Sequence, residues 1–168
     1  MKNIVLVCFM WTGKTVVARL LAKKLKRDFL ELDDMIEKKE GLAIKDIFEQ
    51  KGESYFRRIE KEVVKDACQH KDVVIAAGGG VILDEENLRN LKEDGIVICL
   101  KASPDTILKR TKGLKTRPLL NVPDPEKRIS ELLKQREPYY NKADLSIDTD
   151  KLSIEQIAEK IKTLTQVI

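Results

Sequence analysis

Apolar residues follow two alternating patterns along the chain. Short runs rich in valine, isoleucine and leucine are separated by longer segments in which apolar residues recur at the three-to-four-residue spacing of a helix. A short continuous apolar run bounded by polar residues is typical of a strand that is buried on both faces. The pattern therefore predicts five strands, at residues 4–7, 29–32, 73–77, 96–100 and 145–147.

The helical pattern fills the segments between these strands. Regular alternation of strands and helices predicts an α/β fold, in which a parallel sheet lies between two layers of helices. The segment 112–125 interrupts the pattern with Gly113, three prolines and several charges. It is interpreted as a mobile lid over a site, the alternative being a plain surface loop. The predicted helices cover residues 14–26, 34–39, 44–50, 55–69, 85–93, 104–111, 126–140 and 153–164.

Composition narrows the class of protein. With 168 residues, 42% hydrophobic and 36% charged, the chain is expected to form one domain over residues 1–168. The net charge of +4 is spread along the chain, which favours solvated helix faces over a nucleic-acid partner. Cys8, Cys68 and Cys99 are widely spaced and form no CxxC pair, as expected of reduced thiols in a cytoplasmic protein. The chain also contains no apolar run of the length of a membrane span or signal peptide.

The first predicted strand leads directly into a candidate phosphate-binding loop, residues 8–15. Gly13, Lys14 and Thr15 match the end of this motif, where backbone N–H groups and a lysine bind phosphates and a hydroxyl binds Mg²⁺. Cys8 stands where the motif has its first glycine, and Trp11 puts an indole where the backbone packs against phosphate. The loop predicts ATP binding, while these two departures leave the affinity open.

Four further segments stand out along the chain. They are Glu31-Leu32-Asp33, Gly52-Glu53 with Phe56 to Glu60, Gly78-Gly79-Gly80, and Arg117 to Leu120 followed by Arg136 and Tyr140. In their order along the chain, these segments and the loop resemble the shikimate kinase family almost from end to end. The resemblance implies the strand order 2-3-1-4-5 of the nucleoside monophosphate kinase group, a monomer, and transfer of the γ-phosphate of ATP to the 3-hydroxyl of shikimate.

Shikimate is a carboxylate with three hydroxyls, and the predicted site offers complementary groups. Arg57 and Arg136 can supply forked donors to the carboxylate. Asp33 follows a strand, where it can orient the attacking hydroxyl or take its proton, although a helix N-cap would also explain it. Three consecutive glycines weaken strands and helices, so close approach of the backbone to a ligand is favoured over a turn without one. The resemblance implies that the Gly79 amide donates to shikimate and that Gly78 and Gly80 shape this turn.

The ATP side depends more heavily on the resemblance. It makes Arg117 the lid arginine that closes on the phosphates, and Arg110 the residue that packs on adenine, although Arg110 also fits a solvated helix end. Glu31 stands where the family usually has an aspartate that contacts Mg²⁺ through water. Val16 stands where a second hydroxyl is common. The predicted ATP-binding residues are Trp11, Thr12, Gly13, Lys14, Thr15, Val16, Arg110 and Arg117.

Two alternative functions remain open at this stage. One is a related small-molecule kinase, such as a gluconate or nucleoside monophosphate kinase. The other is a catalytically impaired protein that binds shikimate or regulates a partner, which the substitutions at Cys8 and Trp11 suggest. The expected partners are shikimate and ATP, with no nucleic acid and no membrane. The small basic excess is thus interpreted as a site for anionic small molecules.

Overall fold

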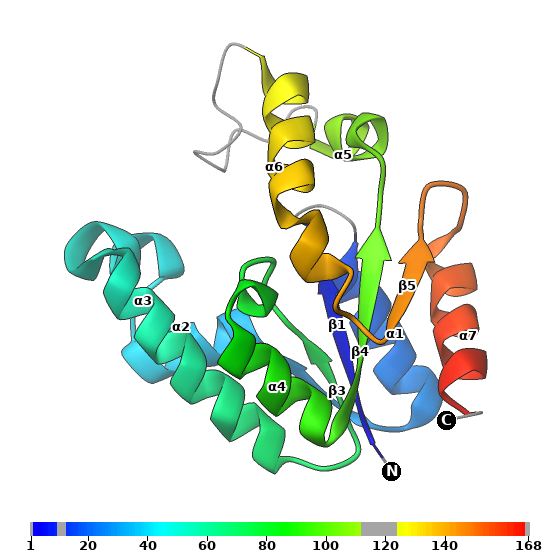
Figure 1. Cartoon of the computed structure of the whole chain (residues 1–168). Helices are drawn as coiled ribbons and strands as arrows, with labels where there is room; N and C mark the ends of the chain where they lie inside the picture. The colour runs from blue at the N-terminus through cyan, green and yellow to red at the C-terminus, as the bar shows by residue number, and fades with distance from the viewer. Residues whose placement is uncertain (1, 10–12, 112–123, 167–168) are drawn as a thin grey trace.

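Five strands lie parallel in one sheet, in the order β2-β3-β1-β4-β5 (Figure 1). The computed structural model describes residues 2–9, 13–111 and 124–166, and the sheet is that of this part of the chain. The observed order confirms the predicted one, and each strand end lies within one residue of its predicted bound. The strands are β1 (Asn3–Cys8), β2 (Asp28–Glu31), β3 (Val73–Ala76), β4 (Gly95–Lys101) and β5 (Leu145–Asp148).

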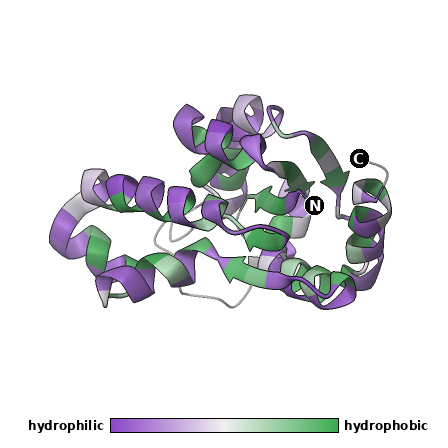
Figure 2. Cartoon of the chain, turned by 90° about the horizontal axis from the view of Figure 1, so that it is seen from below, coloured by the Kyte–Doolittle hydropathy of each residue, from purple (hydrophilic) through white to green (hydrophobic). Residues whose placement is uncertain are grey.

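Helices cover both faces of this sheet. Because strand side chains alternate between the faces, Ile4 and Leu6 of β1 pack toward α1 (Lys14–Leu25) and α7 (Ile154–Thr165). Val5 and Val7 enter the opposite layer, with side chains from α3 (Ile44–Gln69) and α4 (Glu85–Glu93). Each such buried aliphatic side chain stabilises the fold by roughly 1.5–3 kcal/mol. Figure 2 shows the result, with hydrophobic strands in the middle and largely hydrophilic outer helix surfaces.

Two places in the helices need comment. The predicted helices 44–50 and 55–69 lie on either side of a kink within α3 (Ile44–Gln69), at Gly52, where φ is 81° and ψ is 170°. A backbone with this positive φ would be strained for any residue with a side chain, so glycine provides the bend. In addition, α2 (Leu32–Glu40) begins at the first residue after β2, which places Asp33 inside the helix.

The remaining helices lie toward the carboxyl ends of the strands or beside them (Figure 1). They are α4 (Glu85–Glu93), α5 (Pro104–Thr111) and α6 (Pro125–Tyr140), and a short 3₁₀ helix, η1 (Val81–Leu83), follows the three glycines. The predicted lid, 112–125, lies outside the described residues except for its end. There, Asp124 caps α6 through a carboxylate that accepts the Lys127 N–H at 3.0 Å. None of the helices described is long and apolar enough to cross a membrane.

Candidate active site

The end of the phosphate-binding loop has the backbone that this motif requires. Gly13 caps α1 with φ 84° and ψ 14°, a left-handed conformation that glycine adopts without strain. Helix α1 then begins at Lys14, and the N–H groups of a first helical turn, which have no partner within the helix, can bind an anion. Thr15 is half-buried in this turn and Val16 is exposed. The predicted residues Trp11 and Thr12 lie outside the described part of the chain.

Lys14 is held by two neighbouring strand ends. Its Nζ donates to the Ala77 carbonyl oxygen at 2.8 Å and lies 3.3 Å from Oε1 of Glu31. Both side chains of this ion pair are nearly buried, with 11% and 7% exposed. The second Glu31 carboxylate oxygen, Oε2, is buried and has no hydrogen-bond partner among the residues the structure describes. Sequence analysis did not predict this ion pair between Glu31 and the loop lysine. The contact of Glu31 with Mg²⁺ through water stays a prediction.

The three glycines form a turn that brings several site elements together. A Cβ atom on Gly78 would lie 3.0 Å from Oδ1 of Asp33, and one on Gly80 would lie 2.6 Å from Nη1 of Arg57. A Cβ atom on Gly79 would lie 3.0 Å from the Cys8 carbonyl oxygen. Each glycine therefore makes room for a different neighbour, two of which are predicted site residues. The predicted contact between this turn and a ligand stays a prediction.

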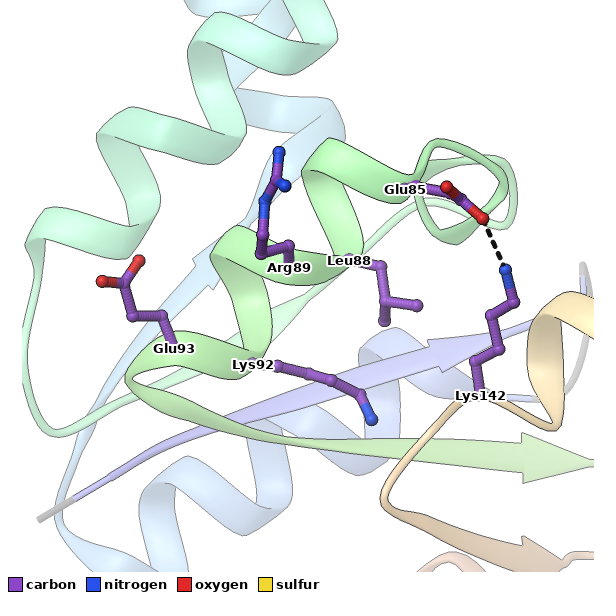
Figure 3. A pocket seen from close by; sticks show the side chains of 6 residues that line it. All are labelled: Glu85, Leu88, Arg89, Lys92, Glu93 and Lys142. Atoms are coloured by element: carbon purple, nitrogen blue, oxygen red, sulfur yellow. Dashed lines mark hydrogen bonds and ion pairs between the residues drawn. The ribbon is translucent and has the colours of Figure 1, made fainter.

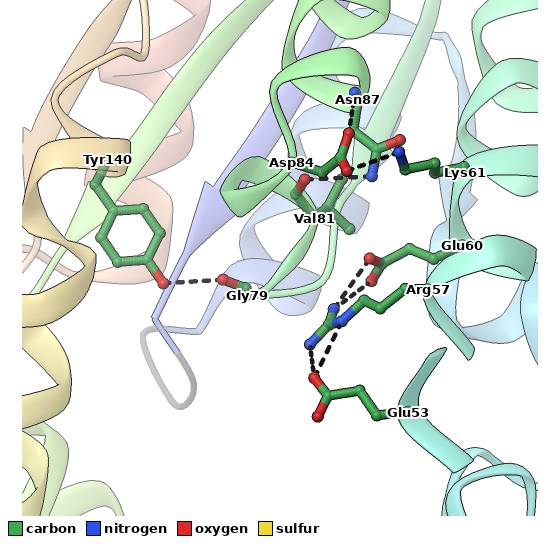
Figure 4. Close-up of polar contacts among 9 residues, drawn as sticks. All are labelled: Glu53, Arg57, Glu60, Lys61, Gly79, Val81, Asp84, Asn87 and Tyr140. Carbon is green, nitrogen blue, oxygen red and sulfur yellow. Dashed lines mark hydrogen bonds and ion pairs between the residues drawn. The ribbon is translucent and has the colours of Figure 1, made fainter. Parts of the chain in front are cut away.

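Arg57 approaches the glycine turn from α3, with a carboxylate on each side of it (Figure 4). Its Nη1 donates to Oε2 of Glu60 at 3.0 Å, and its Nη2 donates to Oε1 of Glu53 at 3.2 Å. The two partners differ in exposure, since 4% of the Glu60 side chain and 68% of the Glu53 side chain are accessible. Burial raises the pKa of Glu60, the charge of Arg57 lowers it, and Asp33 contributes to the rise. Sequence analysis assigned no role to either glutamate.

Helix α6 brings Arg136 and Tyr140 to the same turn. The Arg136 guanidinium lies 5.5 Å from the centre of the Phe9 ring, and its Nη1 is 3.6 Å from the position of a Cβ on Gly79. The Tyr140 hydroxyl donates to the Gly79 carbonyl oxygen at 3.0 Å. Figure 4 shows Tyr140 and Arg57 on opposite sides of the turn. The structure therefore brings the predicted site residues Asp33, Arg57 and Arg136 together around the glycines. Their roles toward a substrate stay predictions.

The structure gives less information on the other two residues predicted to bind ATP, Arg110 and Arg117. Arg110 is exposed near the end of α5. Partial burial opposes ionisation of Asp150, but hydrogen bonds from Ser103 and Thr106, together with the charge of Arg110, hold its pKa below the ordinary value. Arg117 falls outside the described residues. The roles of both arginines therefore stay predictions.

Among the described residues, one hollow adjoins this site and another lies over α4. The first is a cavity of about 270 Å³ between the end of β4, α5 and α6, with Phe9 and Tyr140 in its wall. A wider surface hollow of about 620 Å³ lies over α4 (Figure 3) and contains none of the predicted site residues. An ion pair of 2.8 Å between Lys142 Nζ and Glu85 Oε1 crosses it. The hollow is lined by Glu85, Leu88, Arg89, Lys92, Glu93 and Lys142.

Comparisons with known proteins point to one family. The family described as shikimate kinase matches residues 10–166. The shikimate kinase of Thermodesulfovibrio yellowstonii is 53% identical to this chain, and the match covers 96% of this chain and 93% of the relative. The shikimate kinase of Caldanaerobacter subterraneus is 48% identical, and the match covers 96% of this chain and 94% of the relative. The solved structure of shikimate kinase from Acinetobacter baumannii in complex with shikimate has a TM-score of 0.92 at 41% identity, covering 99% of this chain and 94% of that one. The chain thus belongs to the shikimate kinase family.

Proposed function

We propose that this protein transfers the γ-phosphate of ATP to the 3-hydroxyl of shikimate, giving shikimate 3-phosphate and ADP, in the route through chorismate to the aromatic amino acids. The observation that carries the proposal is the convergence of Arg57, Arg136 and Asp33 on the glycine turn next to Lys14. This places cations for a carboxylate, an acceptor for a hydroxyl and a phosphate-binding lysine in one site. The named relatives, one of them solved with shikimate, support the same substrate.

The substrate carboxylate would lie between Arg57, Arg136 and the Gly79 amide. Glu53 is the exposed partner of Arg57, so the incoming carboxylate can replace it while buried Glu60 keeps its hydrogen bonds. Asp33 then faces the 3-hydroxyl from beside Gly78.

Transfer requires one bond to form as another breaks. The 3-oxygen of shikimate bonds to the γ-phosphorus, the bond from that phosphorus to the bridging oxygen of ADP breaks, and Asp33 takes the hydroxyl proton. Lys14 and Arg117 stabilise the negative charge that spreads over the phosphoryl oxygens. Catalysis depends mainly on positioning and electrostatics.

The residues at the phosphate loop fit a magnesium ion. Thr15 offers a hydroxyl at the start of α1. Glu31 Oε2, which has no partner among the described residues, can accept a hydrogen bond from a metal-bound water. Within the described residues there is no cluster of three or more histidine, cysteine or acidic side chains that could hold a metal, so the phosphates and water would supply the other ligands. When bound, Mg²⁺ neutralises part of the phosphate charge.

Further parts of the proposal rest on the sequence alone. They are a single kinase domain over residues 1–168, a monomer, a cytoplasmic location and a lid at 112–125 that carries Arg117. The curated relatives support one catalytic unit of this size, since the match covers 96% of this chain and 93% of the Thermodesulfovibrio protein.

Release of ADP, measured in the presence of Mg-ATP and shikimate, tests the proposal. Gluconate and nucleoside monophosphates serve as control substrates, and turnover that requires shikimate is the expected result. Titration with Mg-ATP should also change the fluorescence of Trp11, the single tryptophan of the chain. Shikimate binding in a calorimeter with no ADP release would instead support a binding protein, and turnover of a control substrate alone would support another kinase.

A further inference from the structure

Tyr140 is a buried residue of the site to which the proposed reaction gives no role. It lies one helical turn after Arg136 on α6, and 5% of the residue is exposed. Its hydroxyl donates to the Gly79 carbonyl oxygen at 3.0 Å. Burial raises the pKa of Tyr140 to about 12, although the charge of Arg136 lowers it, so the hydroxyl keeps its proton at neutral pH. Tyr140 is therefore a permanent donor to the glycine turn.

The contact fixes one residue of the turn against helix α6. The position of a Cβ on Gly79 lies 3.0 Å from the Cys8 carbonyl oxygen, 3.6 Å from Arg136 Nη1 and 3.8 Å from the Tyr140 hydroxyl. Gly79 is thus enclosed by the end of β1 on one side and by α6 on the other. Since Arg136 and Tyr140 belong to the same rigid helix, the hydrogen bond sets how far the Arg136 guanidinium lies from the Gly79 backbone.

A second connection between α6 and this region is much more exposed. Lys142, just after α6, pairs with Glu85 at 2.8 Å, but 44% and 82% of these two side chains are accessible. Exposed ion pairs of this kind contribute little to the stability of a contact. The hydrogen bond from the buried Tyr140 is therefore better suited than this ion pair to hold the turn at a defined position (Figure 4).

We propose that Tyr140 is a positioning residue for the acidic substrate. It fixes the position of Gly79 relative to Arg136, so that the Gly79 amide and the Arg136 guanidinium can both bind the same carboxylate. The inference rests on the proposed function, because it assigns that carboxylate to shikimate. Loss of the hydroxyl would leave the ring, the helix and the phosphate side in place. It would loosen the geometry of carboxylate binding.

Tyr140→Phe tests this role, with Tyr139→Phe as the matched control. Tyr139 is the preceding residue of α6, is half-buried, and has Lys142 Nζ 5.6 Å from its ring centre. Loss of one hydrogen bond in the site should raise the KM for shikimate about threefold to tenfold in Y140F. The kcat and the KM for ATP should stay near the wild-type values, and Y139F should match wild type in all three. Thermal melting and calorimetric binding of shikimate without ATP separate a folding defect from weakened binding.

The Arg136→Lys background sharpens the test. If Tyr140 acts through the placement of Arg136 against Gly79, Y140F should raise the KM less in R136K than in wild type, because coupled residues are not additive. An unchanged shikimate KM in Y140F, an equal rise in Y139F, a loss confined to kcat, or full additivity with R136K would each overturn the inference. Wild-type protein that neither binds shikimate nor releases ADP with it would remove the proposed function itself.

Discussion

The two sides of the site hold their cations in the same way but expose them differently. The phosphate side is the start of α1, where Glu31 pairs with Lys14. The acid side is the region proposed to bind the carboxylate of shikimate, where Glu60 pairs with Arg57. Both carboxylates are nearly buried, with 7% and 4% of the side chains exposed. However, 11% of Lys14 is accessible against 36% of Arg57. The phosphate side thus encloses its cation, whereas the acid side presents one to an incoming anion.

The chemistry of the two cations explains the difference. The lysine ammonium is a compact charge, and that of Lys14 already contacts the Ala77 carbonyl oxygen and the Glu31 carboxylate. A phosphate must therefore share the ammonium group with these two partners. The planar guanidinium of arginine has N–H donors along two edges. Arg57 donates from one edge to Glu60 and from the other to the exposed Glu53. Substitutions on one side should therefore change the kinetics of ATP, and those on the other the kinetics of shikimate.

Asp33 stands where the two sides meet, and its substitution should have the largest effect. Asp33→Asn removes the proton acceptor and keeps the shape, so kcat should fall by about 10²–10⁴-fold. The KM values for ATP and shikimate should change far less. Asp34→Asn, in the same turn of α2 but exposed, is the matched control and should retain wild-type kcat. A D33N enzyme with near-normal turnover would remove Asp33 as the base.

Glu31→Gln probes the phosphate side alone. It leaves Lys14 nearly buried without its opposite charge and removes an acceptor for metal-bound water. The KM for Mg-ATP should rise about tenfold, as expected for loss of a hydrogen bond to a charged group, while the KM for shikimate stays unchanged. The melting temperature should fall, because one partner of a buried ion pair is lost. Equal increases in both KM values would contradict the division into two sides.

Local patterns predicted most of the fold, whereas the contacts of the site depend on long-range packing. The strands and helices follow from apolar periodicity, which is a local property. The enclosure of Gly79 by Cys8 and Tyr140 joins segments more than sixty residues apart, and periodicity contains no signal for such distances. The kink at Gly52 was predicted as a gap between helices, since a glycine interrupts the pattern whether a helix ends or bends.

Glu60 is a residue that the sequence could have revealed. It occupies the apolar face of α3, four residues after Phe56 and four before Val64, both of which are buried. A carboxylate on such a face needs a partner, and Arg57 lies three residues earlier, within reach on the same helix. The pattern thus marks a buried ion pair, although only the structure shows that it faces the glycine turn.

Glu60→Gln tests the role of Glu60, the buried ion-pair partner of Arg57 on the acid side. Because burial raises the pKa of Glu60, the fold favours the protonated form, and the ionised carboxylate costs stability at neutral pH. The stability from this group is present at low pH and is lost as the pH rises through the folded-state pKa. Glutamine resembles the protonated acid, so E60Q should melt at or above the wild-type temperature at pH 7. The two temperatures should converge as the pH falls.

The same variant should nevertheless bind shikimate more weakly. Both carboxylate oxygens of Glu60 accept hydrogen bonds from Arg57 Nη1, whereas glutamine has only one acceptor oxygen. The Arg57 guanidinium is therefore held less firmly in the variant. The KM for shikimate should rise about tenfold, with the KM for ATP unchanged. Kinetics and melting curves of E60Q together thus separate a role in function from a role in stability. A lower melting temperature with unchanged kinetics would make Glu60 a structural residue.

Glu53→Gln should have the smallest effect and the opposite sign. Glu53 pairs with the same guanidinium as Glu60, but it is 68% exposed and lies on the edge of the fork that shikimate would occupy. The substitution removes the charge of this exposed partner, so Glu53 competes less strongly with the carboxylate of shikimate for the Arg57 fork. The KM for shikimate should therefore fall by up to about fivefold, the range of an exposed ion pair. The effect should shrink as salt rises, because salt weakens exposed pairs more than buried ones. If E53Q raises the KM as E60Q does, both glutamates hold Arg57 in place, and the acid side is as enclosed as the phosphate side.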